Sequence, residues 1–378
     1  MKNRKALVWL FALLAVFSLT ATACSKSDSE GTSTTKDTTA KDGSTTTAAV
    51  DTASLSKLTG TINGGGSSFQ DTFQQANSTA FDKAVKSAGG DATVTYTKSG
   101  SSDGRKALAD KTLDFAGSDG AIKDEEKASF GSRTILYFPI VGGPITVAYN
   151  LKGVDGLKLD ADTIAKIFQA QITSWDDPAI AKDNPKADLP STKITVVHRS
   201  DGSGTTKNFT KYLTAAAPDT WKLDAGEEVN WPASTQGAEK STGVTSVIKG
   251  TDGAVGYVDL ADAAKEGLSV AAVANSSGDF VLPNPGTASA ALAAADVADD
   301  LTYDPLNIDA KGAYPITSPT WVIVDKVQTD AAKAATLKAY LTYALTTGQG
   351  EAKGLLYAPL PKDLAQKALD QVDQITVG

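Results

Sequence analysis

The stretch R-S-D-G-S-G-T at residues 199–205 combines one guanidinium with hydroxyl groups and glycines. Arg199 offers paired N–H donors, Ser203 and Thr205 offer hydroxyl donors, and the two glycines let backbone N–H groups approach a ligand closely. Asp201 can pair with Arg199 across the turn and hold its guanidinium in place. This set of donors is typical of a dry site for a tetrahedral oxyanion. The alternative is an ordinary surface ion pair, which contributes under about 1 kcal/mol.

A second pattern with chemistry in it is G-S-S-D-G at residues 100–104. It matches the G-x-S-x-G elbow of α/β-hydrolases, with Ser102 as the nucleophile. Asp114 or Asp119 and then His198, the only histidine, follow in the chain order of that fold, so His198 would have to be the base. A five-residue pattern in a glycine- and serine-rich chain is weak evidence. A secreted serine hydrolase using Ser102 and His198 therefore stays the alternative function.

The composition argues against metal and nucleotide chemistry. One histidine and one cysteine leave carboxylates as the metal ligands, and pairs such as Asp160 and Asp162 lack the spacing of an EF-hand. The phosphate loop G-x-x-x-x-G-K-[ST] does not occur, and G-G-G-S-S-F at residues 64–69 lacks the last glycine of G-x-G-x-x-G. We predict no metal and no cofactor.

Both candidate stretches follow a predicted strand and precede a predicted helix. Alternating apolar residues predict strands over 58–63, 92–97 and 194–198 and a short strand that ends at Asp119, each followed by a turn rich in Ser, Gly, Thr or Asp. In open α/β sheets, ligands lie beyond the carboxyl ends of strands, against helix N-termini whose free N–H groups favour an anion. The simpler interpretation is that each polar residue only caps a helix, for about 1 kcal/mol. Four such turns, one with an arginine, favour a site.

The rest of the chain adds further elements. The run ILYFPIVGGPITVAYN predicts two apolar strands around a turn at residues 142–144, and the glycines at 64–66 predict a tight bend. Helical spacing predicts helices over 162–168, 331–346 and 362–372. Residues 276–309 show little pattern.

The N-terminus has the features of an exported protein. Residues 1–23 join a basic start to a short apolar run, as in a secretory signal peptide, and Cys24 follows directly. We expect Cys24, the only cysteine, to be lipidated and to anchor the chain to the outer face of the cell membrane, although Ala21 stands where such signals usually have leucine; the alternative is a free or buried thiol. Residues 24–57 are almost all small or polar and predict a flexible tether.

Length and charge limit the partners. The roughly 320 residues after the tether suggest two lobes with cores. Because the leader holds Lys2, Arg4 and Lys5 and no acid, removing it takes the net charge from −8 to about −11. Such an acidic chain is a poor partner for nucleic acid, and it must bind any anion with placed donors and local dipoles.

From about Gly60 onward, the chain resembles the phosphate-binding proteins of high-affinity ABC phosphate importers, here in lipoprotein form. The resemblance rests on an ordered set of segments: GGGSSFQ, GSSDG, LDFAGSD, ITSWDDPAIAKDNP, VVHRSDGSGTTKNFTKYL, GAVGYV and YPITSPTWVIV. It implies an α/β, type II periplasmic-binding-protein fold with a ligand cleft between two lobes. The first lobe would be discontinuous, residues 58–149 and 316–378, and the second would span residues 150–315. The implied partners are inorganic phosphate and the permease of the importer, and the implied role is not enzymatic.

The resemblance also implies the site. Carried over motif by motif, the ligand contacts are Ser68, the backbone N–H of Phe69, Ser101, Asp119, Arg199, Ser203, Gly204 and Thr205, with Asp201 as the partner of Arg199. Two residues depart from the family pattern: Ser68 replaces a threonine and keeps its hydroxyl, and Asp103 replaces a glycine and adds a carboxylate near the site.

The expected selectivity follows from protonation. Phosphate near neutral pH still carries a proton, whereas sulfate does not. An ionised Asp119 accepts a hydrogen bond from that proton but meets only lone pairs on sulfate. A site built to use a ligand hydroxyl rejects the analogue without one by roughly 10⁴ to 10⁵.

Overall fold

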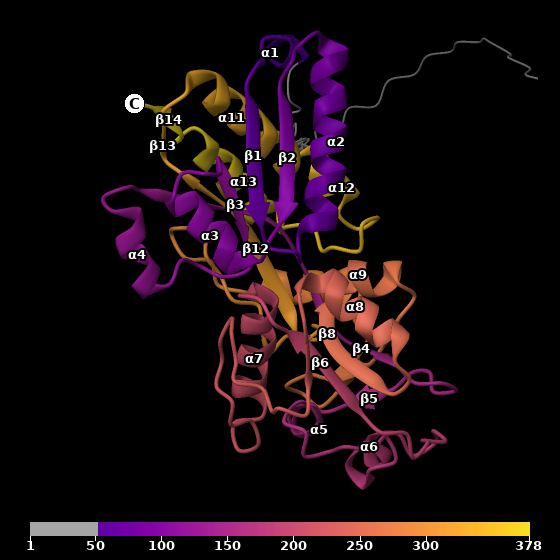
Figure 1. Cartoon of the computed structure of the whole chain (residues 1–378). Coiled ribbons are helices and arrows are strands. Elements are labelled where there is room, and N and C mark those ends of the chain that lie inside the picture. The colour runs from indigo at the N-terminus through magenta and orange to yellow at the C-terminus, as the bar shows by residue number, and fades with distance from the viewer. Residues whose placement is uncertain (1–51) are drawn as a thin grey trace, which may run out of the picture. The chain divides into compact units, whose positions relative to one another are not determined.

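A computed structural model describes residues 52–378, which lie within one unit formed by Thr47–Gly378 (Figure 1). The predicted signal peptide, Cys24 and the predicted tether up to residue 51 lie outside the described residues. The strands are β1 (Thr61–Gly66), β2 (Thr93–Lys98), β3 (Phe115–Ser118), β4 (Ile135–Asn150), β5 (Lys158–Leu159), β6 (Thr195–Arg199), β7 (Gln236–Ala238), β8 (Ala254–Asp259), β9 (Ser269–Val270), β10 (Ala272–Ala274), β11 (Phe280–Val281), β12 (Thr317–Asp325), β13 (Val327–Gln328) and β14 (Thr376–Val377).

The helices are interspersed among these strands along the chain. They are α1 (Thr52–Leu55), α2 (Asp71–Ala88), α3 (Ser101–Ala109), α4 (Asp124–Phe130), α5 (Ala161–Phe168), α6 (Pro178–Asp183), α7 (Gly204–Ala216), α8 (Lys240–Gly250), α9 (Leu260–Lys265), α10 (Pro285–Ala294), α11 (Ala331–Leu345), α12 (Thr347–Glu351) and α13 (Lys362–Val372). None of the helices within residues 52–378 has the length and apolar character that a bilayer-spanning helix requires. The predicted α/β class is confirmed.

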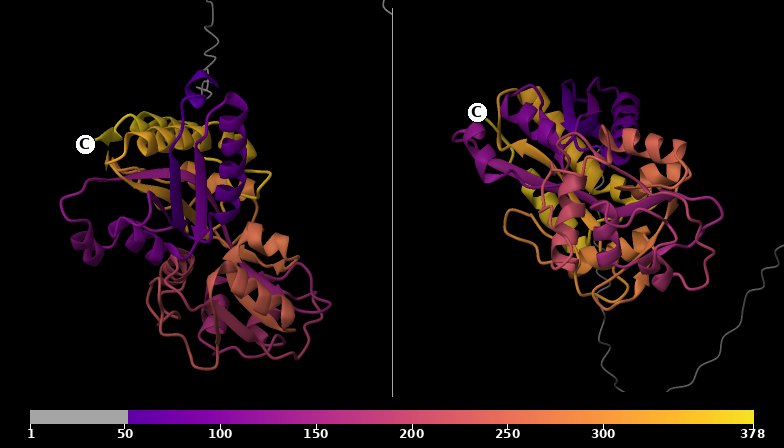
Figure 2. Two further views of the ribbon diagram at one scale, coloured as in Figure 1. Left: turned by 45° about the horizontal axis from the view of Figure 1, so that its top comes forward. Right: turned by 60° about the horizontal axis from the view of Figure 1, so that its bottom comes forward.

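The main sheet has the order β2-β1-β3-β12-β4-β8-β6-β7, with β9 pairing with β4. Strand β1 runs parallel to β2 and β3, and β6 runs parallel to β7 and β8. Between these groups, β12 and β4 run antiparallel to their neighbours. We call the group β1, β2 and β3 the first half of the sheet and the group β6, β7 and β8 the second half; Figure 1 and the two views of Figure 2 show them as separate groups joined by the long strands.

Strand β4 runs from one half of the sheet into the other. Strand β4 pairs with β12 from Ile135 to Pro144 and with β8 from Ile145 to Asn150, so it changes partner instead of turning. The prediction of two strands around residues 142–144 was therefore wrong. Pro144, which has no N–H to donate, lies where the change occurs. A Cβ on the glycine before it, Gly143, would lie 3.2 Å from the Phe69 ring, which is a tight contact.

The glycines of β1 continue the strand, which corrects the predicted bend at residues 64–66. A Cβ on Gly64 would lie 2.0 Å from the ring of Phe115, its partner on β3. Gly66 has φ +133°, a conformation that favours glycine, and a Cβ there would lie 2.2 Å from the carbonyl oxygen of Gly117. The glycines thus let β1 and β3 approach closely, and the turn begins only at Ser67.

Several segments follow the sequence prediction, and two differ. Helices α5, α11 and α13 match the predicted helices over 162–168, 331–346 and 362–372 to within a residue at each end. The predicted tether spans residues 24–57, but its last part contains helix α1, in which Leu55 is buried against the core. The little-patterned residues 276–309 include β11 and α10, and Asn284 caps α10 by accepting hydrogen bonds from two backbone N–H groups.

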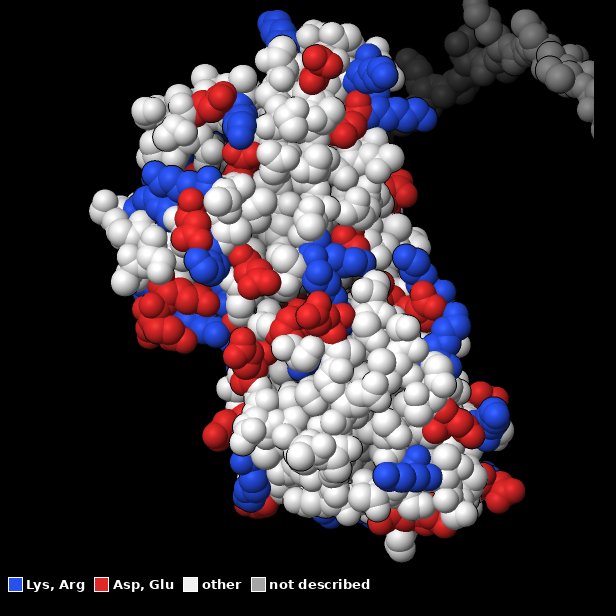
Figure 3. Space-filling model, in the orientation of Figure 1, with Lys and Arg blue, Asp and Glu red and all other residues white. Residues whose placement is uncertain are grey.

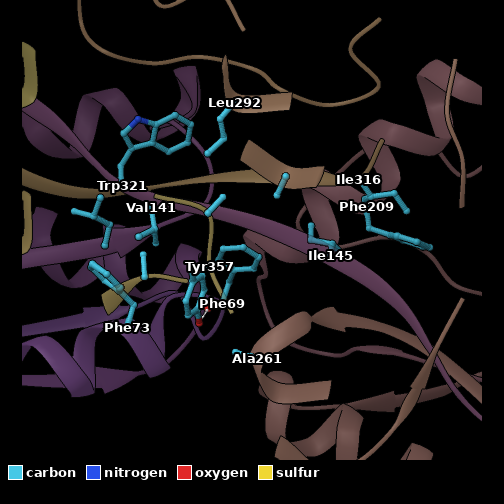
Figure 4. Close-up of a cluster of buried hydrophobic side chains, with 14 of the residues drawn as sticks. Phe69, Phe73, Val141, Ile145, Phe209, Ala261, Leu292, Ile316, Trp321 and Tyr357 are labelled. Atoms are coloured by element: carbon cyan, nitrogen blue, oxygen red, sulfur yellow. Dashed lines mark hydrogen bonds between the residues drawn. The ribbon is translucent and has the colours of Figure 1, made fainter. Parts of the chain in front are cut away.

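One continuous hydrophobic cluster runs through both halves and along the joint (Figure 4). Phe69 and Tyr357 meet edge to face, with ring centroids 5.8 Å apart, beside β4. The hydroxyl of Tyr357 donates to the carbonyl oxygen of Phe69 at 2.6 Å and fixes the turn after β1. A smaller cluster around Val197, Val244 and Val258 lies under the second half.

We expect Gly64→Ala to lower the free energy of unfolding by about 1–3 kcal/mol, because the new methyl group would overlap the Phe115 ring. Gly350→Ala is the control, since Gly350 is an exposed helical residue with open space around it and should lose nothing. Urea unfolding followed by circular dichroism measures both. Equal stabilities for the two variants would contradict the close approach of β1 and β3.

Candidate anion-binding site

The four predicted turns meet between the halves of the sheet. The Ser102 N–H donates to the carbonyl oxygen of Gly202 at 3.3 Å, which joins the turn after β2 to the turn after β6. A Cβ on Gly204, the first residue of α7, would lie 2.5 Å from the Ser101 hydroxyl and 2.8 Å from the Cβ of Asp119. Glycine at this position therefore allows the start of α7 to contact the turns after β2 and β3.

Arg199 is the last residue of β6, and its side chain joins the turn after β6 to the turn after β1. It is 5% exposed; Nε donates to Asp201 Oδ1 at 2.7 Å, Nη2 pairs with Asp201 Oδ2, and Nη1 donates to Ser68 Oγ at 2.9 Å. Asp201 also accepts the backbone N–H of Lys240 at the start of α8. Burial acts to raise the pKa of Asp201, but its bonds to Arg199 outweigh burial and lower it. The guanidinium is therefore held by an ionised carboxylate.

Aromatic residues hold the end of β6. The Arg199 N–H donates to the Tyr257 hydroxyl at 3.0 Å, and that hydroxyl lies 2.6 Å from the Thr206 hydroxyl on α7. The ring of His198 stacks on Trp231, with centroids 4.9 Å apart, and its Nδ1 lies 2.9 Å from the carbonyl oxygen of Arg199. Burial lowers the pKa of His198. His198 thus serves as a packed residue at the strand end.

Asp119, directly after β3, is a carboxylate with 1% exposure. Ser67 Oγ lies 2.7 Å from both of its carboxylate oxygens, and Thr320 Oγ1 on β12 donates to Oδ1 at 2.6 Å. Burial raises the pKa of Asp119 to about 6, against the lowering effects of Thr320, Ser67 and the Arg199 charge. Near neutral pH the group is therefore ionised and already accepts two hydroxyl donors.

Helix α7 contributes a buried hydroxyl that has no partner. Ser203 caps this helix by accepting the N–H of Thr206 at 3.1 Å. Thr205, in the first turn, is 2% exposed, and its Oγ1 finds no hydrogen-bond partner among the described residues. Buried hydroxyls are nearly always hydrogen-bonded, so this one indicates a place where a ligand oxygen would be received.

The first half contributes donors from two turns. Ser68 Oγ accepts a hydrogen bond from Arg199 and also lies 3.0 Å from the hydroxyl of Ser241, the second residue of α8. The Phe69 N–H donates to Ser67 Oγ at 3.0 Å, and the Ser101 hydroxyl lies 3.5 Å from Asp119 Oδ2. The structure thus places the residues predicted as oxyanion ligands on neighbouring turns, and their contacts with a ligand stay predictions. Asp103 is exposed on α3.

Comparisons with known proteins identify relatives of this chain. A family model described as a PBP superfamily domain matches residues 28–347. The chain is 35% identical over 282 residues to the phosphate-binding protein PstS of Xylella fastidiosa, strain Temecula1, which covers 72% of this chain and 76% of that protein. It is 33% identical over 312 residues to the phosphate-binding protein PstS 3 of Mycobacterium tuberculosis, strain H37Rv, with 80% and 84% covered.

The chain belongs to the PstS family of phosphate-binding proteins, within the PBP superfamily.

Solved structures agree on the fold. The periplasmic phosphate-binding protein PfluDING, solved with phosphate bound, is 22% identical with a TM-score of 0.68, and the match covers 82% of this chain and 93% of that one. A phosphate-binding protein from Stenotrophomonas maltophilia is 20% identical with a TM-score of 0.64, covering 82% and 93%. The type II periplasmic-binding-protein fold is confirmed. The lobe boundaries at residues 149/150 and 315/316 stay predictions; β4 ends at Asn150 and β12 begins at Thr317, close to both.

The hydrolase alternative finds no support in the PstS-family structure. Ser102 Oγ donates to Glu227 Oε2 at 2.7 Å, whereas Nδ1 of His198 lies 2.9 Å from the carbonyl oxygen of Arg199. Asp114 is bound to Lys333 and Asp119 to Ser67 and Thr320. The residues named for a triad are thus engaged in separate contacts.

The Asp119 side chain is held by residues that were not predicted from the sequence. Ser67 and Thr320 bind the Asp119 carboxylate, and Asn208 Nδ2 donates to the Asp119 carbonyl oxygen at 2.8 Å. Gln70 Nε2 donates to Thr320 Oγ1 at 2.7 Å. Ser67 and Gln70 flank the predicted pair in GGGSSFQ, so their position was a usable signal; Thr320 lies some 200 residues away from Asp119 and offered none.

The raised pKa of Asp119 predicts a pH dependence of stability. A folded-state pKa of about 6 against an ordinary 3.8 means that the folded protein holds the proton more tightly, so stability is lost as pH rises from about 4 to 6. The loss amounts to about 3 kcal/mol at 1.36 kcal/mol per unit. Asp119→Asn should remove this loss, so that its unfolding free energy rises relative to wild type between pH 4 and pH 7. Urea unfolding in phosphate-free buffers measures the difference, and parallel curves for the two proteins would contradict it.

Proposed function

We propose that this protein is an extracytoplasmic receptor that captures inorganic phosphate between its lobes and delivers it to an ABC importer. The observation that carries the proposal is the presence of a buried carboxylate, Asp119, in the same site as the buried guanidinium of Arg199 and the free hydroxyl of Thr205. Donors alone would suit any oxyanion. A carboxylate among them suits an oxyanion that still carries a proton.

The anion would be held by directed donors. Helix α7 has 13 residues and points its N-terminus into the site, where free N–H groups and the positive end of the dipole favour an anion. Arg199, Ser68, Ser101 and Thr205 add N–H and hydroxyl donors. Long-range attraction plays little part, since the net charge is −8 and Figure 3 shows basic and acidic side chains interleaved over the visible face.

The proton would decide the selectivity. Asp119 already accepts hydrogen bonds from Ser67 and Thr320, and these bonds orient its remaining lone pairs. A phosphate O–H would donate to one of them. Sulfate has no such proton, so its oxygens would face an ionised, buried carboxylate without compensation.

The relatives support the delivery role. Those compared are named phosphate-binding proteins, and the family consists of receptors and not of enzymes. Such a receptor passes its ligand to permease subunits when its lobes close and open. An export signal at residues 1–23 and lipidation of Cys24 would anchor the chain to the outer face of the membrane through the predicted tether that follows Cys24.

Thr205→Val tests the free hydroxyl. Valine has nearly the shape of threonine and removes a buried hydroxyl that has no partner in the protein, so the variant should be as stable as wild type or slightly more so. Phosphate affinity should fall roughly tenfold, because one hydrogen bond to a charged ligand is lost. Thr205→Ser keeps the hydroxyl and should retain most of the affinity. Calorimetric titration decides; equal phosphate affinity for Val and wild type would contradict the role of Thr205.

Asp119→Asn tests the function and its selectivity together. Wild type at pH 8 should bind phosphate and reject sulfate, whereas the amide of Asn can donate to sulfate and should let sulfate bind. Lowering the pH of wild type to 5 should have the same effect, because the Asp119 pKa of about 6 leaves the carboxyl protonated there and able to donate. Calorimetric titration with both anions at pH 5 and 8 measures this. Wild type that binds neither anion, or both equally at pH 8, would disprove the proposed function.

A further inference from the structure

A buried ion pair joins the two halves of the sheet beside the anion site. Arg105 lies on α3, one helical turn after Ser101, and is 1% exposed; Glu227, in the segment after α7, is 2% exposed. Arg105 Nη1 donates to Glu227 Oε1 at 2.8 Å, and Nη2 donates to Oε2 at 2.6 Å. Such a two-point contact between guanidinium and carboxylate is among the strongest and most directional of side-chain pairs. We call it the Arg105–Glu227 pair.

The Glu227 carboxylate, in the second half, contacts several donor groups of the first half. Ser102 Oγ donates to its Oε2 at 2.7 Å, and Lys123 Nζ lies 2.8 Å from the same oxygen. Its backbone carbonyl oxygen accepts the N–H of Ser203, the cap of α7, at 3.1 Å. The side chain thus contacts the turn after β2, and the backbone contacts the turn that carries the oxyanion donors.

The arginine is held in place independently of Glu227. On its own half, Arg105 Nε donates to Glu126 Oε2 at 2.7 Å and Nη2 donates to Oε1 at 2.8 Å, and Nη1 also donates to Ser118 Oγ. The guanidinium is therefore preorganised, and little side-chain entropy is lost when Glu227 meets it. Burial acts to raise the pKa of Glu227, but Arg105, Lys123 and Ser102 outweigh burial and lower it to about 2. The pair stays charged across physiological pH.

We propose that the Arg105–Glu227 pair is an interlobe latch, which sets how long phosphate is retained by opposing the separation of the lobes. The proposal deepens the proposed function and rests on it. The two residues act on the joint between the lobes, whereas the anion is received by the turns after β1, β2, β3 and β6. Breaking a buried, hydrogen-bonded charge pair at an interface mainly speeds dissociation, so the latch acts on the release of phosphate.

Glu227→Gln and Glu126→Gln form a matched pair of variants. Both remove one carboxylate charge that contacts the same guanidinium, but Glu227 lies across the joint and Glu126 on the same half as Arg105. With Glu227→Gln, the release rate of phosphate should rise on the order of tenfold while the association rate does not fall. With Glu126→Gln, the melting temperature should fall and the release rate should stay within about twofold of wild type. Stopped-flow displacement of labelled phosphate, with circular dichroism for the fold, gives these values.

The outcomes separate the two proposals. If wild type and Glu126→Gln bind phosphate and Glu227→Gln releases it at the wild-type rate, the latch is disproved and the receptor function stands. If wild type binds no phosphate, both fail. Glu227→Asp keeps the charge but draws it back from Arg105; it should show a smaller increase in release rate, and it decides the question if the Gln variant does not fold. In the double variant Arg105→Gln/Glu227→Gln, phosphate release should be no faster than in Glu227→Gln alone. The reason is that the single variant already lacks the Arg105–Glu227 pair.

Discussion

The burial of one carboxylate, Asp119, constrains the rest of the structure. A charge with 1% exposure is stable only when hydrogen bonds replace its water. The sheet supplies them through its register: Trp321 on β12 stands opposite Ser118 on β3, so the residue before it, Thr320, lies beside Asp119. The antiparallel strand β12 thus supplies Thr320 at this point, whereas β1 on the other side of β3 is parallel. The late return of the chain through β12 completes the surroundings of a group that was placed two hundred residues earlier.

The same two strands also determine how the lobes are joined. Because β4 changes its partner from β12 to β8 without a loop, the connection between the halves is hydrogen-bonded sheet along its length. Two polar contacts cross this joint, from Arg199 to Ser68 and from Arg105 to Glu227. The packed ring of Phe69 lies against Gly143 next to the change of partner, so the turn after β1 and the joint are in direct contact.

The sequence predicted those features that depend on local spacing. The strand-to-helix turns, the helices at the C-terminus and the grouping of Arg199 with Ser203 and Thr205 all follow from periodicity and from residue types within a few positions. Predictions failed where a distant neighbour decides the local structure. The glycine at position 64 predicted a bend. In the structure Gly64 lies within β1, and the Phe115 ring on β3 leaves no room for a side chain there. The roles of Thr320 and Glu227 could not be read from their neighbours in sequence either, because both roles come from pairing across long separations.

The charges around the site explain how an acidic protein can hold an anion. Arg199 is paired with Asp201 and Arg105 with Glu126 and Glu227, so the guanidinium charges near the site are already balanced by protein carboxylates. Attraction by net charge is then weak, and it would not distinguish one divalent anion from another. In the proposed site, the direction of the donors would distinguish anions: N–H groups and hydroxyls would point toward the ligand, with one carboxylate among them. An arrangement of this kind recognises where the protons of an anion are, and a strongly positive site could not do so, because its attraction depends only on total charge.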